Sequence, residues 1–139
     1  MILNLRVLFL KSVHQILFKL AEWLKGDFIL KISIPIQAPK LSVVEYFKGN
    51  VIYVNVMKNM SVDCDCCAVA EDPCMKDIGI LVSLDPIAID QACLDLVYAA
   101  DDPGRDHLIE RIESRNGVHT IEAAAALGFG SRKYDLVEV

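Results

Sequence analysis

The chain has 139 residues, of which 54% are hydrophobic and 24% are charged, and its formal net charge is -5. This length and composition indicate one globular domain with its own hydrophobic core, and they exclude a disordered chain or one that depends on disulfides. The acidic balance argues against nucleic acid as a partner, because phosphate binding requires a basic face.

Charge divides the chain at about residue 41. Residues 1–41 hold six Lys and Arg side chains against two acidic ones, whereas residues 42–139 hold eight basic and seventeen acidic side chains. We therefore interpret residues 1–41 as a divergent N-terminal helix and strand, and residues 42–139 as an α/β domain.

The first 25 residues are densely apolar, but Arg6, Lys11 and Lys19 interrupt them before any run reaches the roughly 20 residues that span a bilayer. Apolar residues recur at helical spacing, which predicts an amphipathic helix within Met1–Lys25 that ends near Gly26. Its apolar stripe is Val13, Ile16, Leu17, Leu20 and Leu24. We expect its apolar face to cover the domain's own sheet or a partner subunit. A membrane surface is the less favoured alternative.

Three further elements precede the most informative stretch of the chain. Alternation of apolar residues from Phe28 to Ile36 predicts a strand. Because Pro35 cannot donate a backbone hydrogen bond, the strand lies at a sheet edge or ends at Pro35. Ser42 and Glu45 form a capping box for a short helix. Residues 51–57 are rich in β-branched side chains and predict a strand that leads directly into a cysteine-rich loop.

That loop, Ser61–Cys74, contains four of the five cysteines. Cys64 and Cys66 are two residues apart, so in an extended segment they point to the same side, as two ligands of one metal ion require. We expect the loop to bind an iron-sulfur cluster or a single iron or zinc ion. The candidate ligands are Asp63, Cys64, Asp65, Cys66, Cys67 and Cys74.

Two alternatives remain for the loop. It is a solvated acidic loop with reduced cysteines, or it supplies a cysteine nucleophile with His107 or His119 as its base. No catalytic residue is assigned. The odd number of cysteines and their tight spacing favour a reducing compartment, and we expect a cytoplasmic protein.

Residues 78–83 form a continuous apolar run that predicts a central strand buried on both faces. Asp85 and Pro86 follow as helix cap and first helical residue, predicting a helix to about Ala100. A strand that turns at once into a helix is half of a βαβ unit, whose sites lie at the carboxyl ends of strands. We therefore expect the cysteine loop and Asp85 to face one crevice, with Asp85 a further candidate metal ligand.

Asp90 lies beside the apolar arc of this helix on a helical wheel, between Val97 and Leu94. A carboxylate at the core must be hydrogen-bonded or paired with a cation. Asp90 therefore either anchors a neighbouring segment or helps to bind a metal at Cys64 and Cys66. In the second case it is a direct ligand or supports a residue that is one.

The remaining elements complete the expected fold. A second helix carries Leu108, Ile109 and Ile112 as its apolar stripe, an alanine-rich helix starts at Thr120, and residues 134–139 form a last strand. The expected fold class is α/β, with a small mixed sheet of about four strands flanked by helices in a single domain.

Four sequence blocks stand out in residues 42–139: C-D-C at 64–66, D-I-G-I-L-V-S at 77–83, D-P-I-A-I-D-Q-A-C at 85–93 and A-L-G-F-G-S-R-K-Y at 126–134. In this order and spacing they resemble the C-terminal part of the domain-of-unknown-function 362 family, which is described as iron-sulfur centre proteins, over roughly residues 42–139.

The resemblance implies an iron-sulfur (4Fe-4S) or other metal-associated module for electron transfer, acting with a redox partner or as a homo-oligomer. Longer members carry ferredoxin-type cysteine runs that this chain lacks, so only the C-D-C residues, Asp85 and Asp90 carry over. A structural or interaction domain that lacks its cofactor segment is the alternative.

Overall fold

The computed structural model describes residues 6–10, 46–47, 50–62, 69 and 71–139. The strands form one sheet in the order β2-β3-β1-β4. The elements follow one another as β1 (Arg6–Leu10), β2 (Tyr53–Met57), β3 (Gly79–Ser83), α3 (Pro86–Ala99), α4 (Arg105–Ser114), α5 (Gly117–Ala126) and β4 (Asp135–Glu138). The α/β class expected from the sequence is confirmed.

The sheet is mixed, and both neighbours of β3 are antiparallel to it. β2 pairs with β3 from Tyr53 opposite Ser83 to Met57 opposite Gly79, and β1 pairs with β3 antiparallel and with β4 parallel. After α3 the chain continues into α4 and α5 and returns as β4 beside β1. The expected βαβ unit is therefore wrong, because β4, the strand after the helices, is parallel to β1 and hence antiparallel to β3.

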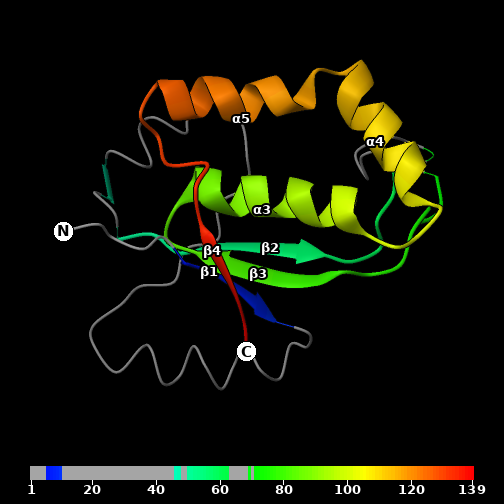
Figure 1. Ribbon diagram of the computed structural model, residues 1–139, viewed down its shortest axis with the longest axis horizontal. Helices are drawn as coiled ribbons and strands as arrows, with labels where there is room; N and C mark the ends of the chain where they lie inside the picture. Colours follow the sequence, from blue (N-terminus) through cyan, green and yellow to red (C-terminus); the bar gives the residue numbers. More distant parts are fainter. Residues whose placement is uncertain (1–5, 11–45, 48–49, 63–68, 70) are drawn as a thin grey trace.

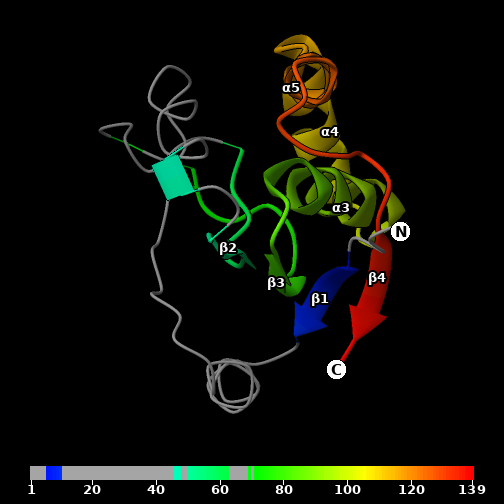
Figure 2. The same cartoon turned by 90° about the vertical axis from the view of Figure 1, so that its left-hand side faces the viewer.

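All three described helices lie on one face of the sheet, with α3 against the strands and α5 above α3 (Figures 1 and 2). β3 is buried at every position, as its continuous apolar sequence predicts. The core beneath α3 includes Val7 of β1, Leu81 of β3 and Ile89 of α3. Burial of these side chains from water stabilises the layer by about 2 kcal/mol for each large aliphatic residue.

The sequence predicted most element boundaries within the described residues. α3 begins directly after Asp85 and ends at Ala99, as expected. The alanine-rich helix begins at Gly117 instead of Thr120, because Asn116 adopts a left-handed φ of 53° and completes a turn of only two residues after α4.

β1 was not predicted. Its sequence, R-V-L-F-L, lies within the first 25 residues, where the sequence indicated a helix. A continuous apolar run of this length has neither the period of a helix nor that of a half-buried strand, so only its neighbours decide its conformation. Here β3 and β4 pair with it on both sides.

Three expectations fall outside the described residues: the amphipathic helix at 13–24, the strand at 28–36 and the capping box of Ser42 and Glu45. Among the helices that the structure describes, none is long and apolar enough to cross a membrane.

Candidate functional site

The cysteine-rich loop is closed at its base by backbone contacts. The backbone N–H of Cys74 donates to the carbonyl oxygen of Met60 at 2.8 Å, and the Cys74 thiol contacts the same oxygen at 3.3 Å. The hydroxyl of Ser61 donates to the carbonyl of Glu71 at 2.9 Å. Residues 60–61 and residues 71–74 therefore lie side by side at the base of the loop.

A second set of contacts lies between this base and the sheet. The backbone N–H of Asn59 donates to Asp77 Oδ1 at 2.8 Å, and Lys58 Nζ lies 3.5 Å from Asp77 Oδ2. The N–H of Ile78 donates to Met57 at 2.9 Å. The connection from β2 to β3 is thus fixed on both sides up to the loop.

The turn between α3 and α4 supports the loop base from the other side. Asp102 accepts hydrogen bonds from the backbone N–H of Lys76, at 3.1 Å, and of Gly104, at 2.8 Å. These two backbone donors, together with the nearby Lys76 charge, lower the pKa of Asp102. Gly104 packs so closely on Cys74 that a Cβ there would lie 1.7 Å from the Cys74 carbonyl oxygen.

The lowered pKa of Asp102 predicts a pH-dependent contribution to stability. Its stabilising effect should be complete above the ordinary pKa of 3.8 and should disappear as pH falls through the lower folded-state value. We expect Asp102→Asn to be less stable than the parent protein near neutral pH. The difference should shrink at acidic pH, as measured by urea denaturation at a series of pH values.

Asp101→Asn, at the exposed neighbouring position, is the matched control and should change stability less. A difference between Asp102→Asn and the parent that stays constant down to the lowest pH would contradict the proposed role of the Asp102 carboxylate.

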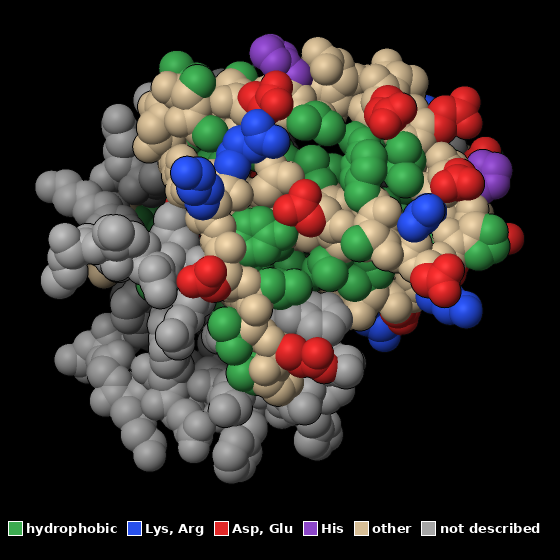
Figure 3. Space-filling model, viewed as in Figure 1, with side chains coloured by type: hydrophobic (Ala, Val, Ile, Leu, Met, Phe, Trp, Pro, Cys, Tyr) green, Lys and Arg blue, Asp and Glu red, His purple; other side chains and the backbone are tan. Residues whose placement is uncertain are grey.

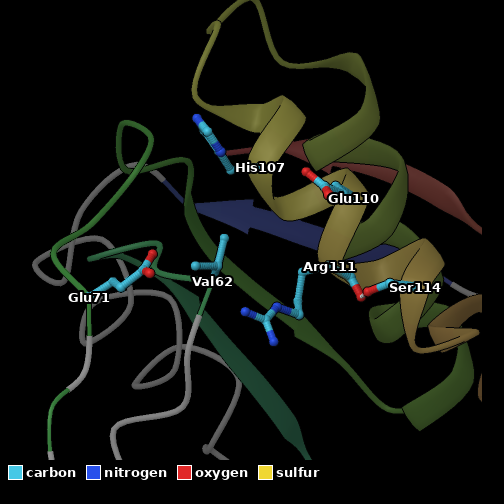
Figure 4. A pocket seen from close by; sticks show the side chains of 6 residues that line it. All are labelled: Val62, Glu71, His107, Glu110, Arg111 and Ser114. Atoms are coloured by element: carbon cyan, nitrogen blue, oxygen red, sulfur yellow. Dashed lines mark hydrogen bonds between the residues drawn. The ribbon is translucent and has the colours of Figure 1, made fainter.

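A pocket of about 260 Å³ lies between the loop and α4. Figure 4 shows Glu71 reaching toward it from the loop side and Arg111 from the helix. Val62, which directly precedes Asp63, forms part of its wall. The full lining is Val62, Glu71, His107, Glu110, Arg111 and Ser114. The pocket thus adjoins the described ends of the cysteine loop and presents charges of both signs.

The structure separates the two histidines considered as bases. His107 lies in the pocket lining beside the loop, whereas His119 lies in α5, where its Nδ1 is 3.9 Å from Glu122 Oε2. Of the two, His107 is therefore the histidine beside the described ends of the loop. Sequence reasoning missed the polar side chains beside it, Glu110, Arg111 and Ser114, although their i, i+3, i+4 and i+7 spacing marks one helix face.

The expected metal ligands are only partly described. Asp63, Cys64, Asp65, Cys66 and Cys67 lie outside the described residues. Cys74 lies at the loop base, with its thiol directed at the Met60 carbonyl. No group of three or more His, Cys, Asp or Glu side chains that could hold a metal ion occurs among the residues that are described.

Asp85 lies at the far end of the sheet from the loop base. In the antiparallel β2-β3 pair, the loop follows Met57 and Asp85 follows Ser83, so the two segments leave from opposite ends. The expected shared crevice is therefore wrong for the described ends of these segments. Carboxyl ends meet at one edge only when strands are parallel.

The Asp85 carboxylate has three backbone partners. Oδ1 accepts from Ile87 N at 2.8 Å and Ala88 N at 2.9 Å, which caps α3, and Oδ2 accepts from Ser131 N at 2.9 Å. Asp85 is 8% exposed. These contacts give it a structural role in joining the start of α3 to the C-terminal segment.

Asp90 is half-buried and tied to the middle of β2. Asn55 Nδ2 donates to Asp90 Oδ1 at 3.2 Å and also contacts Cys93 Sγ at 3.2 Å. Burial raises the pKa of the Cys93 thiol to about 11, with the Asn55 hydrogen bond opposing this effect and Asp90 adding to it. Cys93 is therefore a protonated thiol at neutral pH, and Asp90 joins α3 to β2.

We expect Asp90→Asn to lower the free energy of unfolding by about 1 kcal/mol, because it removes the charge from one side-chain hydrogen bond. Metal content should not change. Urea denaturation and metal analysis of the same preparation measure the two properties.

A double-mutant cycle with Asn55→Ala supplies the control, since the two changes should be non-additive if the contact carries the effect. Lower metal content with unchanged stability would instead give Asp90 a role in metal binding.

Two of the sequence blocks contact each other in the fold. Arg132 Nε donates to Gln91 Oε1 at 2.8 Å, and the Tyr134 hydroxyl donates to Asp95 Oδ2 at 2.6 Å. With the Asp85–Ser131 contact, these bonds attach the G-S-R-K-Y segment along the first ten residues of α3. Several residues of the segments 85–95 and 130–134 thus hold the C-terminal segment against α3.

Comparison with known families covers the loop and the elements around it. Residues 12–95 match the family model described as a domain of unknown function (DUF362). The match includes β2, the loop, β3 and α3 as far as Asp95, together with residues 12–41, for which the sequence blocks showed no resemblance. No curated protein and no solved structure matches the chain. Because the matched residues make up more than half of the chain, the protein belongs to the DUF362 family.

Proposed function

We propose that this protein is a metal-thiolate module in which the Ser61–Cys74 loop binds an iron-sulfur cluster or a single iron or zinc ion. Cys64 and Cys66 are its principal ligands. The acidic residues beside them, Asp63 and Asp65, add negative charge that favours a cation. An iron centre here would exchange single electrons with a redox partner, whereas zinc would be redox-inactive and structural.

The closed loop base is the observation that carries this proposal. Contacts of Met60 with Cys74 and of Ser61 with Glu71 bring the two ends of the loop together. Asp77 and the turn at Asp102 then fix those ends to the sheet and to α3. A short loop whose ends are held in this way loses less conformational entropy on binding a metal than a free segment would.

The pocket beside the loop gives a partner or substrate a place to approach it. Its lining combines Arg111 and His107 with the carboxylates of Glu71 and Glu110. Asp and Glu side chains are spread over the described face in Figure 3, with basic side chains among them. Because residues 42–139 hold seventeen acidic and eight basic side chains, a redox partner that presents basic groups fits the charge of this part of the chain best.

The test is purification without oxygen, followed by metal analysis and a visible absorption spectrum. We expect bound iron or zinc, and we expect the double variant Cys64→Ser/Cys66→Ser to lose it entirely. Cys93→Ser is the matched control and should keep the metal, because Cys93 lies in α3, where its thiol contacts Asn55 of β2.

Metal-free parent protein with fully titratable thiols would overturn the proposal. That result would favour a structural or interaction domain, which is supported by a separate observation: Asp85 and Asp90, both candidate ligands, make structural hydrogen bonds. Sedimentation analysis of the metal-free protein would then establish whether it forms a homo-oligomer.

A further inference from the structure

The sheet ends at β2. β3 is its neighbour on one side, and among the residues that the structure describes no strand pairs with its other side. Figure 2 shows β2 and β4 at the two ends of the sheet. A strand at the end of a sheet presents backbone N–H and C=O groups that can pair with a strand of another chain. The outer edge of β2 is therefore a candidate interaction surface.

The backbone groups of Val54 and Val56 point toward this outer edge. The carbonyl of Met57 accepts from the backbone N–H of Ile78 at 2.9 Å, so it is directed toward the β3 side. Successive residues of a strand direct their backbone groups to opposite sides. Those of Asn55 therefore face β3 as well, whereas those of the two valines face outward.

The side chains of β2 do not block pairing with another strand. Its sequence, Y-V-N-V-M, contains no charged residue and no proline, and Val54 and Val56 are 37% and 59% exposed. Charges and prolines are the usual means by which edge strands avoid pairing with other chains. The other end of the sheet has this protection, because β4 carries Asp135 and Glu138. The open edge of β2 is thus the one suited to a partner strand.

A second copy of β2 is complementary to this edge in one register. If two copies pair antiparallel about a two-fold axis at Asn55, Val54 of each copy lies opposite Val56 of the other. Tyr53 then lies opposite Met57. The outward N–H and C=O groups of the valines supply about four hydrogen bonds between the copies. No charged side chain enters the pairing, although each copy has a net charge of -5.

We propose that the protein forms a symmetric dimer in which the β2 edges of two copies pair antiparallel and join the two sheets into one. The two-fold axis is perpendicular to the sheet, so the helical layers of both copies lie on the same face. The pairing uses residues 53–57 and none of the pocket residues or candidate metal ligands. It is therefore independent of the metal proposed for the loop.

Sedimentation velocity of the anaerobically purified protein, from low to high micromolar concentration, tests the dimer. We expect a concentration-dependent equilibrium between monomer and dimer. Val56→Lys should raise the dissociation constant by about tenfold or more, because the lysine occurs twice in the symmetric interface. Leu136→Lys is the matched control at the other end of the sheet, where Leu136 is 43% exposed, and should leave the dissociation constant unchanged. Circular dichroism checks that both variants fold.

A mixture of two variants tests the register. Val54→Glu alone should weaken the dimer as Val56→Lys does. Mixing the two proteins should restore a dimer that contains one copy of each, because the glutamate at position 54 then lies opposite the lysine at position 56. A mixture that stays monomeric contradicts the register centred on Asn55.

Amide exchange followed by NMR tests the edge without a substitution. Protection of the Val54 and Val56 N–H groups should increase with protein concentration, whereas that of Asn55, whose N–H faces β3, should not change. Exchange that is independent of concentration at both valines overturns the proposal. So does a parent protein that stays monomeric at high micromolar concentration, or a dimer that Val56→Lys leaves intact or that Leu136→Lys weakens equally.

Discussion

Replacing Gly104 by alanine is expected to lower the free energy of unfolding by about 3 kcal/mol. A Cβ at this position would lie 1.7 Å from the carbonyl oxygen of Cys74 and 2.7 Å from its carbonyl carbon. Both atoms belong to the backbone, so the clash cannot be relieved by rotating a side chain. The backbone of Gly104 has φ -67° and ψ -18°, which any residue adopts, so the cost comes from space alone.

The same clash should loosen the cysteine loop. Displacement of Cys74 weakens its bond to Met60, which closes the loop base. We therefore expect faster protease cleavage within residues 61–73 and lower metal content in Gly104→Ala. Urea denaturation, limited proteolysis and metal analysis measure the three effects.

Gly128→Ala is the matched control. Gly128 has φ +81° and open space around its Cα, so alanine should cost only about 1 kcal/mol through backbone strain and should leave the loop intact. Equal stability losses in the two variants would show that the contact between Gly104 and Cys74 is not a close one in solution.

The local signals in the sequence predicted the part of the fold that they control. Asp85 and Pro86 fix the start of α3, and the continuous apolar run at 79–83 marks a strand buried on both faces. Both follow from interactions within a few residues. The topology does not follow from such local interactions, because the antiparallel pairing of β3 depends on β1, which lies more than 60 residues away in the sequence.

The candidate site shows the same limit. The sequence identified the cysteine loop but not the residues that close it, because the Gly104 and Asp102 contacts with Cys74 and Lys76 join segments about 26 to 30 residues apart. It also placed Asp85 beside the loop by a rule that holds for parallel strands. The sequence predicted which side chains could bind a metal, but it did not predict the strand direction that separates Asp85 from the loop.

Asp85→Ala is expected to lower the free energy of unfolding by about 3 kcal/mol, because it leaves three backbone N–H groups without their acceptor. Two of these cap α3, at Ile87 and Ala88, and the third, at Ser131, holds the C-terminal segment. Water replaces a buried carboxylate poorly, and Asp85 is only 8% exposed. Urea denaturation measures the loss.

Asp85→Ser divides this effect into its two parts. A serine hydroxyl still caps the helix, but it is too short to reach Ser131 as well, so the stability loss should be nearer 1 kcal/mol. Amide exchange should then accelerate selectively at residues 129–134, where Gly130 lies so close to Asp85 that a Cβ would be 2.1 Å from its Oδ1. Metal content should equal that of the parent, since Asp85 leaves the sheet at the end opposite the loop base. Loss of metal with normal exchange at residues 129–134 would contradict the structural role and return Asp85 to the ligand set.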